Sequence, residues 1–281
     1  MSQPQLPLVA EAAEIAERLD EPGLQVVFVG EPQVFATAHL PGASHIEYGS
    51  LNAAHPPAGG LLPSMEALAQ VLGAAGITPE THVVAYDASG NAQASRLIWT
   101  LECLGHDAAT LLNGGLAAWM DEKRAVESGM STSARPAAPY PAELRKPEAI
   151  ASRHYILEHL EDAQTVILDA RSPGEYSGEV VRAAKSGHIP GAINLEWTQN
   201  FDADNAMRLK PREALKAMYE DLGVTPDKEV IAHCQTHHRS ALTCLVLRYL
   251  GYPRVRGYDG SWSEWGNQAD SPVVSGSDPR A

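Results

Sequence analysis

The feature that most constrains this chain is an internal repeat: one series of landmarks occurs twice, in the same order, over 281 residues. Such self-similarity means that the chain builds one structural design twice. In the first half the series is VVFVGE (26–31), AHLPGASHIEY (38–48), THVVAYD (81–87), LIWTLECLGH (97–106) and LLNGGLAAWMDE (111–122). In the second half it is VILDAR (166–171), GHIPGAINLEW (187–197), KEVIAHC (228–234), TCLVLRYLGY (243–252) and RGYDGSWSEWGN (256–267).

Each half alternates between short β-rich runs and helical patterns. The stretches EALAQVLGAAG (66–76) and REALKAMYEDLG (212–223) have the apolar spacing of amphipathic helices. Strands that alternate with helices indicate a mostly parallel sheet with helices on both faces. We therefore predict an α/β fold of two tandem domains, each a mostly parallel sheet flanked by helices. The predicted boundaries are 1–129 for the N-terminal domain, 130–147 for a linker and 148–281 for the C-terminal domain.

Charge and composition narrow the classes of function. The formal net charge of −14 argues against nucleic acid or a membrane as a partner, because nucleic acids and anionic membranes attract basic surfaces. An anionic substrate would need a local positive field in such a protein. The start MSQPQLPLVAEAAEIAERL has no basic segment followed by an apolar core, and no apolar run has the length of a membrane span. The three cysteines, Cys103, Cys234 and Cys244, form no CxxC motif and suit a reducing compartment, so we expect a cytoplasmic protein.

One cysteine stands where a parallel strand should end. In KEVIAHCQTHHRSALTCLVLRYLGYPRV the apolar run 230–232 predicts a strand, and 241–250 predicts an apolar helix that Gly251 closes as a left-handed cap. Cys234 opens the turn between them, where the unpaired amides and the dipole of the next helix favour a thiolate. The other two cysteines lie within apolar helical patterns and are expected to be buried hydrophobic residues.

Four kinds of chemistry use a cysteine in such a turn. A metal site would use the neighbouring imidazoles, but the chain has no second ligand cluster at zinc-finger spacing. A cysteine hydrolase needs a histidine within hydrogen-bond reach of the sulfur, and sequence spacing does not identify one. A phosphatase loop would wrap a phosphoryl group; here four residues separate Cys234 from Arg239, one fewer than in phosphatase loops, so the loop suits a smaller electrophile.

The fourth kind is sulfur transfer, because the chain resembles the rhodanese family of sulfurtransferases. The resemblance rests on the loop CQTHHR followed by Ser, an upstream GHIPGA, a strand end DAR and a later GSWSEW, and it covers nearly the whole chain. The whole loop is similar to that of tandem-domain bacterial thiosulfate sulfurtransferases, in which the N-terminal copy is inactive. Here Asp87 stands opposite Cys234, and its turn DASGNAQASR holds no sulfur nucleophile. We therefore expect 1–129 to be the inactive copy and Asp87 to cap a turn and a helix.

The resemblance implies a role for each residue of the loop. Cys234 would take sulfane sulfur from a donor, become a persulfide and pass the sulfur to a thiophilic acceptor such as cyanide or a thiol. The substrate-binding residues that it implies are Arg182, Gln235, Thr236, His237, His238 and Arg239. Amides that follow the cysteine lower a thiol pKa, and a guanidinium suits an oxyanion such as thiosulfate. The resemblance implies no metal and no organic cofactor; a protein that accepts the sulfur is a further partner to consider.

Other motif residues are expected to serve the scaffold. Asp169, Arg171 and His188 are expected to orient neighbouring loops, Lys185 to be an exposed charge and Trp197 to belong to the core. The loop has His237 where relatives often have Gly, a position that suits a left-handed backbone. Next to the cysteine stands Gln235 rather than a basic or a small residue, so thiosulfate and 3-mercaptopyruvate both stay open as donors. Arg239, the two loop histidines and the whole-loop match favour thiosulfate; the alternatives are a 3-mercaptopyruvate sulfurtransferase and a persulfide carrier that serves a biosynthetic partner.

Overall fold

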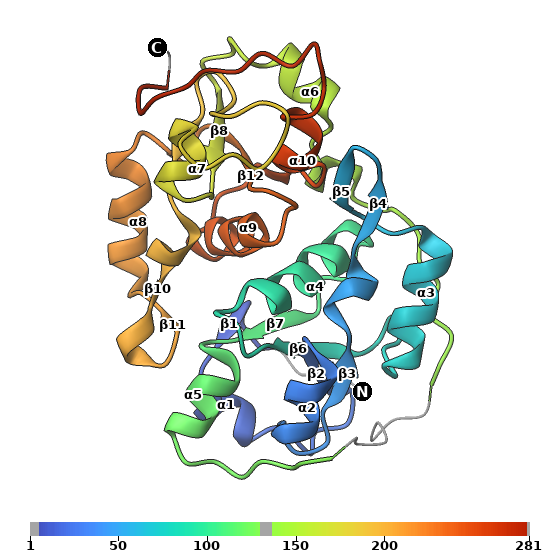
Figure 1. Cartoon of the computed structure of the whole chain (residues 1–281). Coiled ribbons are helices and arrows are strands. Elements are labelled where there is room, and N and C mark those ends of the chain that lie inside the picture. Colours follow the sequence, from blue (N-terminus) through green and yellow to red (C-terminus); the bar gives the residue numbers. More distant parts are fainter. Residues whose placement is uncertain (1–5, 130–136, 280–281) are drawn as a thin grey trace. The chain divides into compact units, whose positions relative to one another are not determined.

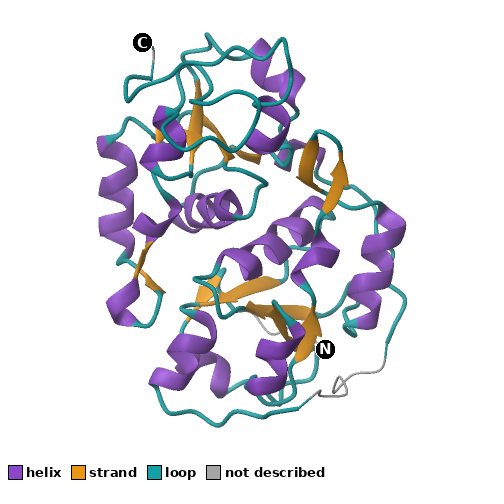
Figure 2. Cartoon of the chain, viewed as in Figure 1, coloured by secondary structure: helices purple, strands orange, loops and turns teal. Residues whose placement is uncertain are grey.

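The computed structural model describes residues 6–129 and 137–279, which form two compact α/β units (Figures 1 and 2). The N-terminal unit comprises Met1–Leu51, Pro63–Lys146 and Phe201–Leu209. The C-terminal unit comprises Asn52–Leu62, Pro147–Asn200 and Lys210–Ala281. The predicted fold class is confirmed, because each unit holds a parallel sheet flanked by helices.

The sheet of the N-terminal unit has the strand order β1-β7-β6-β2-β3, and all neighbouring strands are parallel. The strands are β1 (Val9–Ala10), β2 (Leu24–Val29), β3 (Ser44–Ile46), β6 (His82–Tyr86) and β7 (Ala109–Leu112). Every residue of β2 and β6 is buried, as expected for central strands that helices cover on both faces.

Helices cover both faces of this sheet. The helices of the unit are α1 (Ala12–Ala16), α2 (Pro32–Thr37), α3 (Met65–Ala74), α4 (Ala92–Cys103) and α5 (Gly115–Asp121), with the 3-10 helix η1 (Tyr48–Leu51). Side chains of α1, α2 and α5, among them Ile15, Phe35 and Trp119, form one core with Phe28 and Tyr86 of the sheet. The apolar helix α4 packs against β6 and β7 from the other face (Figure 1).

The sheet of the C-terminal unit has the order β13-β12-β8-β9, again with parallel neighbours. Its strands are β8 (Thr165–Asp169), β9 (Ile193–Asn194), β12 (Glu229–His233) and β13 (Val255–Gly257). Its helices are α6 (Arg153–Glu158), α7 (Pro173–Ser177), α8 (Arg212–Asp221), α9 (Arg239–Leu250) and α10 (Ser261–Trp265), with the 3-10 helices η2 (Pro147–Ala149) and η3 (Trp197–Asn200). Residues of α6, α7 and α10 form one core with Ile167 and Ile231, while α9 packs against β12 and β13 and contacts α8.

Several predicted elements are confirmed with small shifts at their ends. The pattern 66–76 forms α3, 212–223 forms α8, and the apolar helix after the cysteine is α9. Gly251 closes α9 with φ of 92°, the left-handed cap that the sequence predicts.

Two hairpins each belong to the unit that is formed mainly by the other half of the chain. The hairpin of β4 (Ala53–His55) and β5 (Ala58–Leu61) comes from the first half of the chain but belongs to the C-terminal unit. The hairpin of β10 (Phe201–Asp202) and β11 (Arg208–Leu209), with η4 (Ala203–Asn205) between the strands, comes from the second half and belongs to the N-terminal unit. The predicted domains 1–129 and 148–281 do not include this exchange.

The predicted linker, 130–147, is only partly covered, because 130–136 lie outside the described residues. Its later part runs along the N-terminal unit: the amide of Ala138 donates to the carbonyl of Gly73 (3.0 Å). The amides of Arg145 and Lys146 both donate to the carbonyl of Cys103 (3.0 Å each). These bonds explain why the N-terminal unit extends to Lys146.

Candidate active site around Cys234

The candidate nucleophile ends a central strand. β12 ends at His233 and α9 begins at Arg239, so Cys234 lies in the turn between them and is fully buried. Within the turn, His237 has φ of 53°, which is the left-handed backbone conformation anticipated for this position. Histidine pays a conformational cost there that glycine would not.

The surroundings of Cys234 favour its anion. Burial raises the pKa of the thiol, but the charge of Arg239, the Ser240 hydroxyl and the amides of Ser240 and Thr236 together lower it below its usual value. We call these four donors and the loop that carries them the sulfur cradle. A thiol whose pKa is lowered and whose anion is held by fixed donors suits attack on a sulfur atom.

Arg239 is held in place by an acidic side chain. Its Nη1 lies 2.6 Å from Glu175 Oε2 and its Nη2 lies 3.0 Å from Oε1. Burial lowers the pKa of Arg239, whereas Glu175 and the Cys234 thiolate raise it above its usual value. The guanidinium therefore stays charged, and its two-point contact with Glu175 fixes its direction.

Sequence reasoning missed Glu175, although a local signal marked it. Ser172 and Glu175 form a capping box at the start of α7, with Pro173 at the first helical position. The spacing predicts the cap, but the pairing with Arg239 spans 64 residues of sequence and needs the fold.

The substrate-binding residues that the resemblance implies fall into two groups. The side chains of Gln235, Thr236, His238 and Arg239 are half-buried. Arg182 is exposed, and its carbonyl accepts a hydrogen bond from Gln235 Nε2 (3.4 Å), which brings its segment to the loop. His237 differs, because its side chain is fully buried and its Nδ1 lies 2.8 Å from Ser240 Oγ.

The segment after β13 packs against the backbone of the cysteine loop, and the sequence analysis did not assign it to the site. Ser261 Oγ accepts hydrogen bonds from the amides of Cys234 (3.3 Å) and His237 (3.1 Å). The amide of Trp262 donates to the carbonyl of Cys234 (3.0 Å), and the amide of Ser263 donates to that of Gln235 (3.0 Å). The motif GSWSEW thus satisfies the backbone of a strained turn.

The hairpin β4–β5 also belongs to the site, which nothing in the sequence indicates. The amide of Gly59 donates to Ser263 Oγ (2.9 Å), and the amide of Leu62 donates to Asp259 Oδ2 (2.9 Å). Gly60 lies directly on the loop: a Cβ atom at this position would stand 2.1 Å from the carbonyl oxygen of Thr236. Figure 1 shows β5 beside α10, in agreement with these bonds.

The DAR and GHIPGA residues serve the scaffold, as expected. Asp169 and Arg171 form a buried ion pair (2.6 Å), and Arg171 also donates to the carbonyl of Gly187 (2.7 Å). His188 is buried and stacks on the ring of Tyr176 at 3.7 Å between centroids.

Two further expectations need adjustment. Lys185 is not simply an exposed charge, because its Nζ donates to the carbonyls of Ala269 (2.8 Å) and Ser271 (2.6 Å). Trp197 was expected in the core but is half-buried at the start of η3, with its ring centroid 6.3 Å from that of His238. An aromatic ring beside the loop can pack against a bound molecule, whereas a core residue cannot.

The N-terminal unit carries the corresponding turn around Asp87. Its buried carboxylate accepts hydrogen bonds at 2.9 Å from the amides of Ser89, Asn91, Gln93 and Ala94. Burial raises the pKa of Asp87 above its usual value, and these four bonds offset only part of that rise. The predicted role of Asp87 as a cap of turn and helix is confirmed by these bonds.

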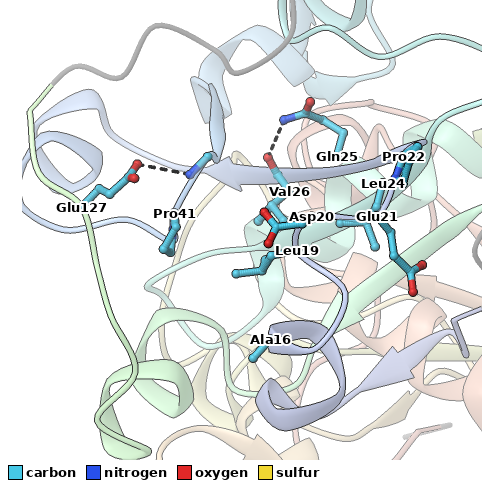
Figure 3. A pocket seen from close by; sticks show the side chains of 11 residues that line it. Ala16, Leu19, Asp20, Glu21, Pro22, Leu24, Gln25, Val26, Pro41 and Glu127 are labelled. Atoms are coloured by element: carbon cyan, nitrogen blue, oxygen red, sulfur yellow. Dashed lines mark hydrogen bonds between the residues drawn. The ribbon is translucent and has the colours of Figure 1, made fainter.

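The hollow drawn in Figure 3 is a poor site for an anion. It lies at the amino end of β2, where Leu24 and Gln25 begin the strand, at the edge opposite to the Asp87 turn. Its wall carries the carboxylates of Asp20, Glu21 and Glu127, which would repel a dianion such as thiosulfate. The positive field that an anionic donor needs is therefore found at the sulfur cradle and not here.

Within 6–129 and 137–279, no three His, Cys, Asp or Glu side chains are grouped so that they could bind a metal ion. No helix in those ranges is both long enough and apolar enough to span a bilayer.

A buried cysteine with a lowered thiol pKa, placed at the carboxyl end of a parallel sheet beside loop amides and a cation, is an arrangement typical of a cysteine nucleophile. Comparison with known proteins gives the family: the model described as Rhodanese-like domain matches residues 11–122 and 152–268. The chain therefore belongs to the rhodanese family and carries its domain twice, which confirms the resemblance found in the motifs.

Relatives span nearly the whole chain. The thiosulfate sulfurtransferases of Pseudomonas aeruginosa and Azotobacter vinelandii are each 46% identical over 268 residues, which are 95% of this chain and 97% of each relative. The sulfur carrier protein TtuD of Thermus thermophilus is 34% identical, over 93% of this chain and 94% of its own length. The solved structure of the anaerobic ergothioneine biosynthesis enzyme from Chlorobium limicola superposes with a TM-score of 0.86 at 23% identity, covering 96% of this chain and 70% of that one, a likeness of fold.

Proposed function

We propose that this protein is a thiosulfate sulfurtransferase that moves sulfane sulfur to cyanide or a thiol through a persulfide on Cys234. The observation that carries the proposal is the sulfur cradle, in which Arg239, Ser240 and loop amides lower the pKa of a buried thiol against the effect of its burial. The 46% identity to two thiosulfate sulfurtransferases supports the choice of thiosulfate as donor.

The cycle has two half-reactions of the ping-pong type. The Cys234 thiolate attacks the outer sulfur of thiosulfate; an S–S bond forms, the S–S bond of the donor breaks, and sulfite leaves with the electron pair. The persulfide then carries the negative charge on its outer sulfur, where the same cradle can hold it. Cyanide or a thiolate attacks that sulfur, and Cys234 returns to the thiolate. Neither half-reaction needs a metal or an organic cofactor.

The donor would be bound by the loop and by Arg182. Arg239 supplies positive charge beside the sulfur, and exposed Arg182 offers a second guanidinium from the segment that Gln235 contacts. Thr236 contributes its amide, and half-buried His238 lies at the mouth of the loop beside Trp197. The ring of His237 is buried, and it contacts the hydroxyl of Ser240.

We further propose that the N-terminal unit is a catalytically inactive copy. Its turn is filled by the carboxyl group of Asp87, whose oxygens accept hydrogen bonds from four amides of the turn. Five residues after Asp87 stands Ala92, where the C-terminal unit has Arg239 after Cys234. A turn without a sulfur nucleophile or a cation cannot form and hold a persulfide.

A protein that accepts sulfur from Cys234 is the alternative to a small acceptor. It is favoured by the relationship to the sulfur carrier protein TtuD, which is 34% identical over nearly the full length. A reduced thiol at Cys234 is required in every cycle, which supports a reducing compartment such as the cytoplasm.

The proposal is tested by intact-mass spectrometry of the purified protein before thiosulfate, after it and after added cyanide. We expect a gain of one sulfur atom that maps to Cys234 and disappears with cyanide, and no gain in Cys234→Ala. A gain with 3-mercaptopyruvate but not with thiosulfate would change the donor. Sulfur uptake that persists in the folded Cys234→Ala protein would overturn the assignment.

A further inference from the structure

The buried ring of His237 reaches the nucleophile through one hydroxyl group. His237 Nδ1 lies 2.8 Å from Ser240 Oγ, and the Ser240 side chain is a hydrogen-bond partner of the Cys234 sulfur. All three side chains are buried completely, so water does not compete for these bonds.

The single proton on Ser240 Oγ determines the direction of the two hydrogen bonds that link His237, Ser240 and Cys234. A serine hydroxyl has one proton to donate and two lone pairs to accept. A thiolate sulfur can only accept, so the Ser240 proton must point at Cys234 when the anion is stabilised. His237 Nδ1 must then carry a hydrogen and donate to Ser240 Oγ, which fixes the imidazole in its Nδ1–H form. If Nδ1 were bare, it would attract the same proton and turn it away from the sulfur.

We propose that His237 is a positioning residue that holds the Ser240 hydroxyl proton on the sulfur of Cys234. This inference rests on the proposed function, since it concerns how the same nucleophile is kept ready. It also explains why a costly left-handed backbone, with φ of 53°, carries a histidine here. Glycine would relax the turn, but it would leave the hydroxyl without a donor behind it.

Other charged or titratable groups around the cysteine also influence the ionisation of its thiol. They are Arg239 at the start of α9, its partner Glu175 of α7, His233 of β12, and the pair of Asp169 and Arg171 at the end of β8. None of them is changed in the variants below, so a difference in the ionisation of Cys234 reports on the hydroxyl.

The test is a double-mutant cycle read out as ionisation of the Cys234 thiol. The thiolate is followed by its ultraviolet absorbance as a function of pH, as a difference from Cys234→Ser, in the wild type, Ser240→Ala, His237→Gly and the double variant. Losing the hydrogen bond from the hydroxyl to the anion should lower the thiolate-to-thiol ratio about tenfold in Ser240→Ala. His237→Gly keeps the hydroxyl but no longer holds its proton in one direction, so the ratio should fall by a smaller factor. Because both residues act through one proton, the double variant should equal Ser240→Ala alone.

Two results would overturn the proposal: additive effects in the double variant, or wild-type ionisation in His237→Gly. His237→Asn is the conservative partner, since its side-chain amide can donate to Ser240 and asparagine tolerates positive φ. It should keep the ionisation near wild type; a drop as large as that of Ser240→Ala would contradict the role as donor. The absorbance needs no sulfur donor, so it stands apart from the proposed function, whose failure would show as absent sulfur uptake in the wild type.

Discussion

The hairpin β4–β5 makes the sharpest prediction, because one glycine of it touches the catalytic loop. A Cβ atom on Gly60 would lie 2.1 Å from the carbonyl oxygen of Thr236, and ordinary contact begins at 3.4 Å. In Gly60→Ala the loop or the hairpin must therefore retreat by the difference, 1.3 Å. The backbone adds a cost of about 1 kcal/mol, because Gly60 has φ of 79°, where an alanine is strained.

The expected effect falls on sulfur transfer more than on folding. Thr236 supplies one of the amides that lower the pKa of Cys234, so its displacement moves a donor of the sulfur cradle. Misplacing a catalytic group by 1 Å can cost about 100-fold in rate, and we expect a loss of this order in kcat/KM for sulfite release from thiosulfate. Gly59→Ala is the matched control, since its Cβ would meet only ordinary contacts at 3.7 and 3.8 Å.

Both variants are assayed for sulfite release in the presence of cyanide and for thermal unfolding. Gly59→Ala should behave like the wild type in both measurements. A Gly60→Ala protein that is as active as Gly59→Ala would refute the reasoning, because it would mean that the hairpin does not position Thr236. A protein that loses its fold would instead show the loss in the melting curve.

Three further predictions follow from single contacts. The ion pair with Arg239 and the hydrogen bonds of Ser172 outweigh the effect of burial and lower the pKa of Glu175 below 4.5. Its contribution to stability is therefore complete above pH 4.5 and is lost as the pH falls toward the pKa of the folded state. Glu175→Gln should reduce this loss of stability at acid pH in denaturant titrations, and an unchanged pH dependence would contradict the pairing. Arg182→Ala should raise KM for thiosulfate with little change in kcat, whereas Arg18→Ala on the surface of the N-terminal unit should leave both unchanged; an unaltered KM in Arg182→Ala would remove it from donor binding. Asp87→Asn places a side-chain NH2 group against backbone N–H donors and should lower the free energy of unfolding by about 1–3 kcal/mol. Sulfur uptake, measured by mass spectrometry, should stay intact. Loss of uptake in a stable variant would give Asp87 a part in the chemistry.

The parts of the fold and site that were predictable are those set by local sequence. The repeat, the parallel sheets and α9 with its Gly251 cap follow from periodicity and cap residues. The left-handed backbone of His237 was anticipated only from the resemblance, because loops of that family often have glycine at this position. In each case the signal lies in a short stretch of sequence, even though the parallel strands themselves pair with distant segments.

The missed parts depend on contacts between distant segments. Glu175 is recognisable as a capping residue, but its pairing with Arg239 arises only when β8 and β12 lie side by side. Ser261 occurs in a quoted motif, yet its bonds to two loop amides depend on the parallel register of β12 and β13. The exchanged hairpins have no periodicity that reveals their destination, since strands of two to four residues carry almost no pattern.

The two units show that the turn is built in the same way whatever side chain fills it. The amide of Leu116 donates to the carbonyl of Asp87 (2.8 Å), just as that of Trp262 donates to the carbonyl of Cys234 (3.0 Å). The residues before these donors share a left-handed backbone, with φ of 56° at Gly115 and 51° at Ser261. The fold therefore provides a turn of inward-facing amides twice, and the amides do not themselves make a site reactive.

Reactivity depends on what occupies the amides. A carboxylate satisfies them with its own two oxygens and has no bond to form, so the Asp87 turn is a stable end state. A thiolate accepts the same hydrogen bonds but can still form a bond to a second sulfur. The negative charge then lies on that outer sulfur, where the nearby guanidinium of Arg239 can stabilise it. The two turns differ in chemistry at the strand end and five residues beyond it, where Asp87 and Ala92 stand in one and Cys234 and Arg239 in the other, as an inert and a reactive copy would require. This supports the proposal that sulfur transfer is confined to the C-terminal unit.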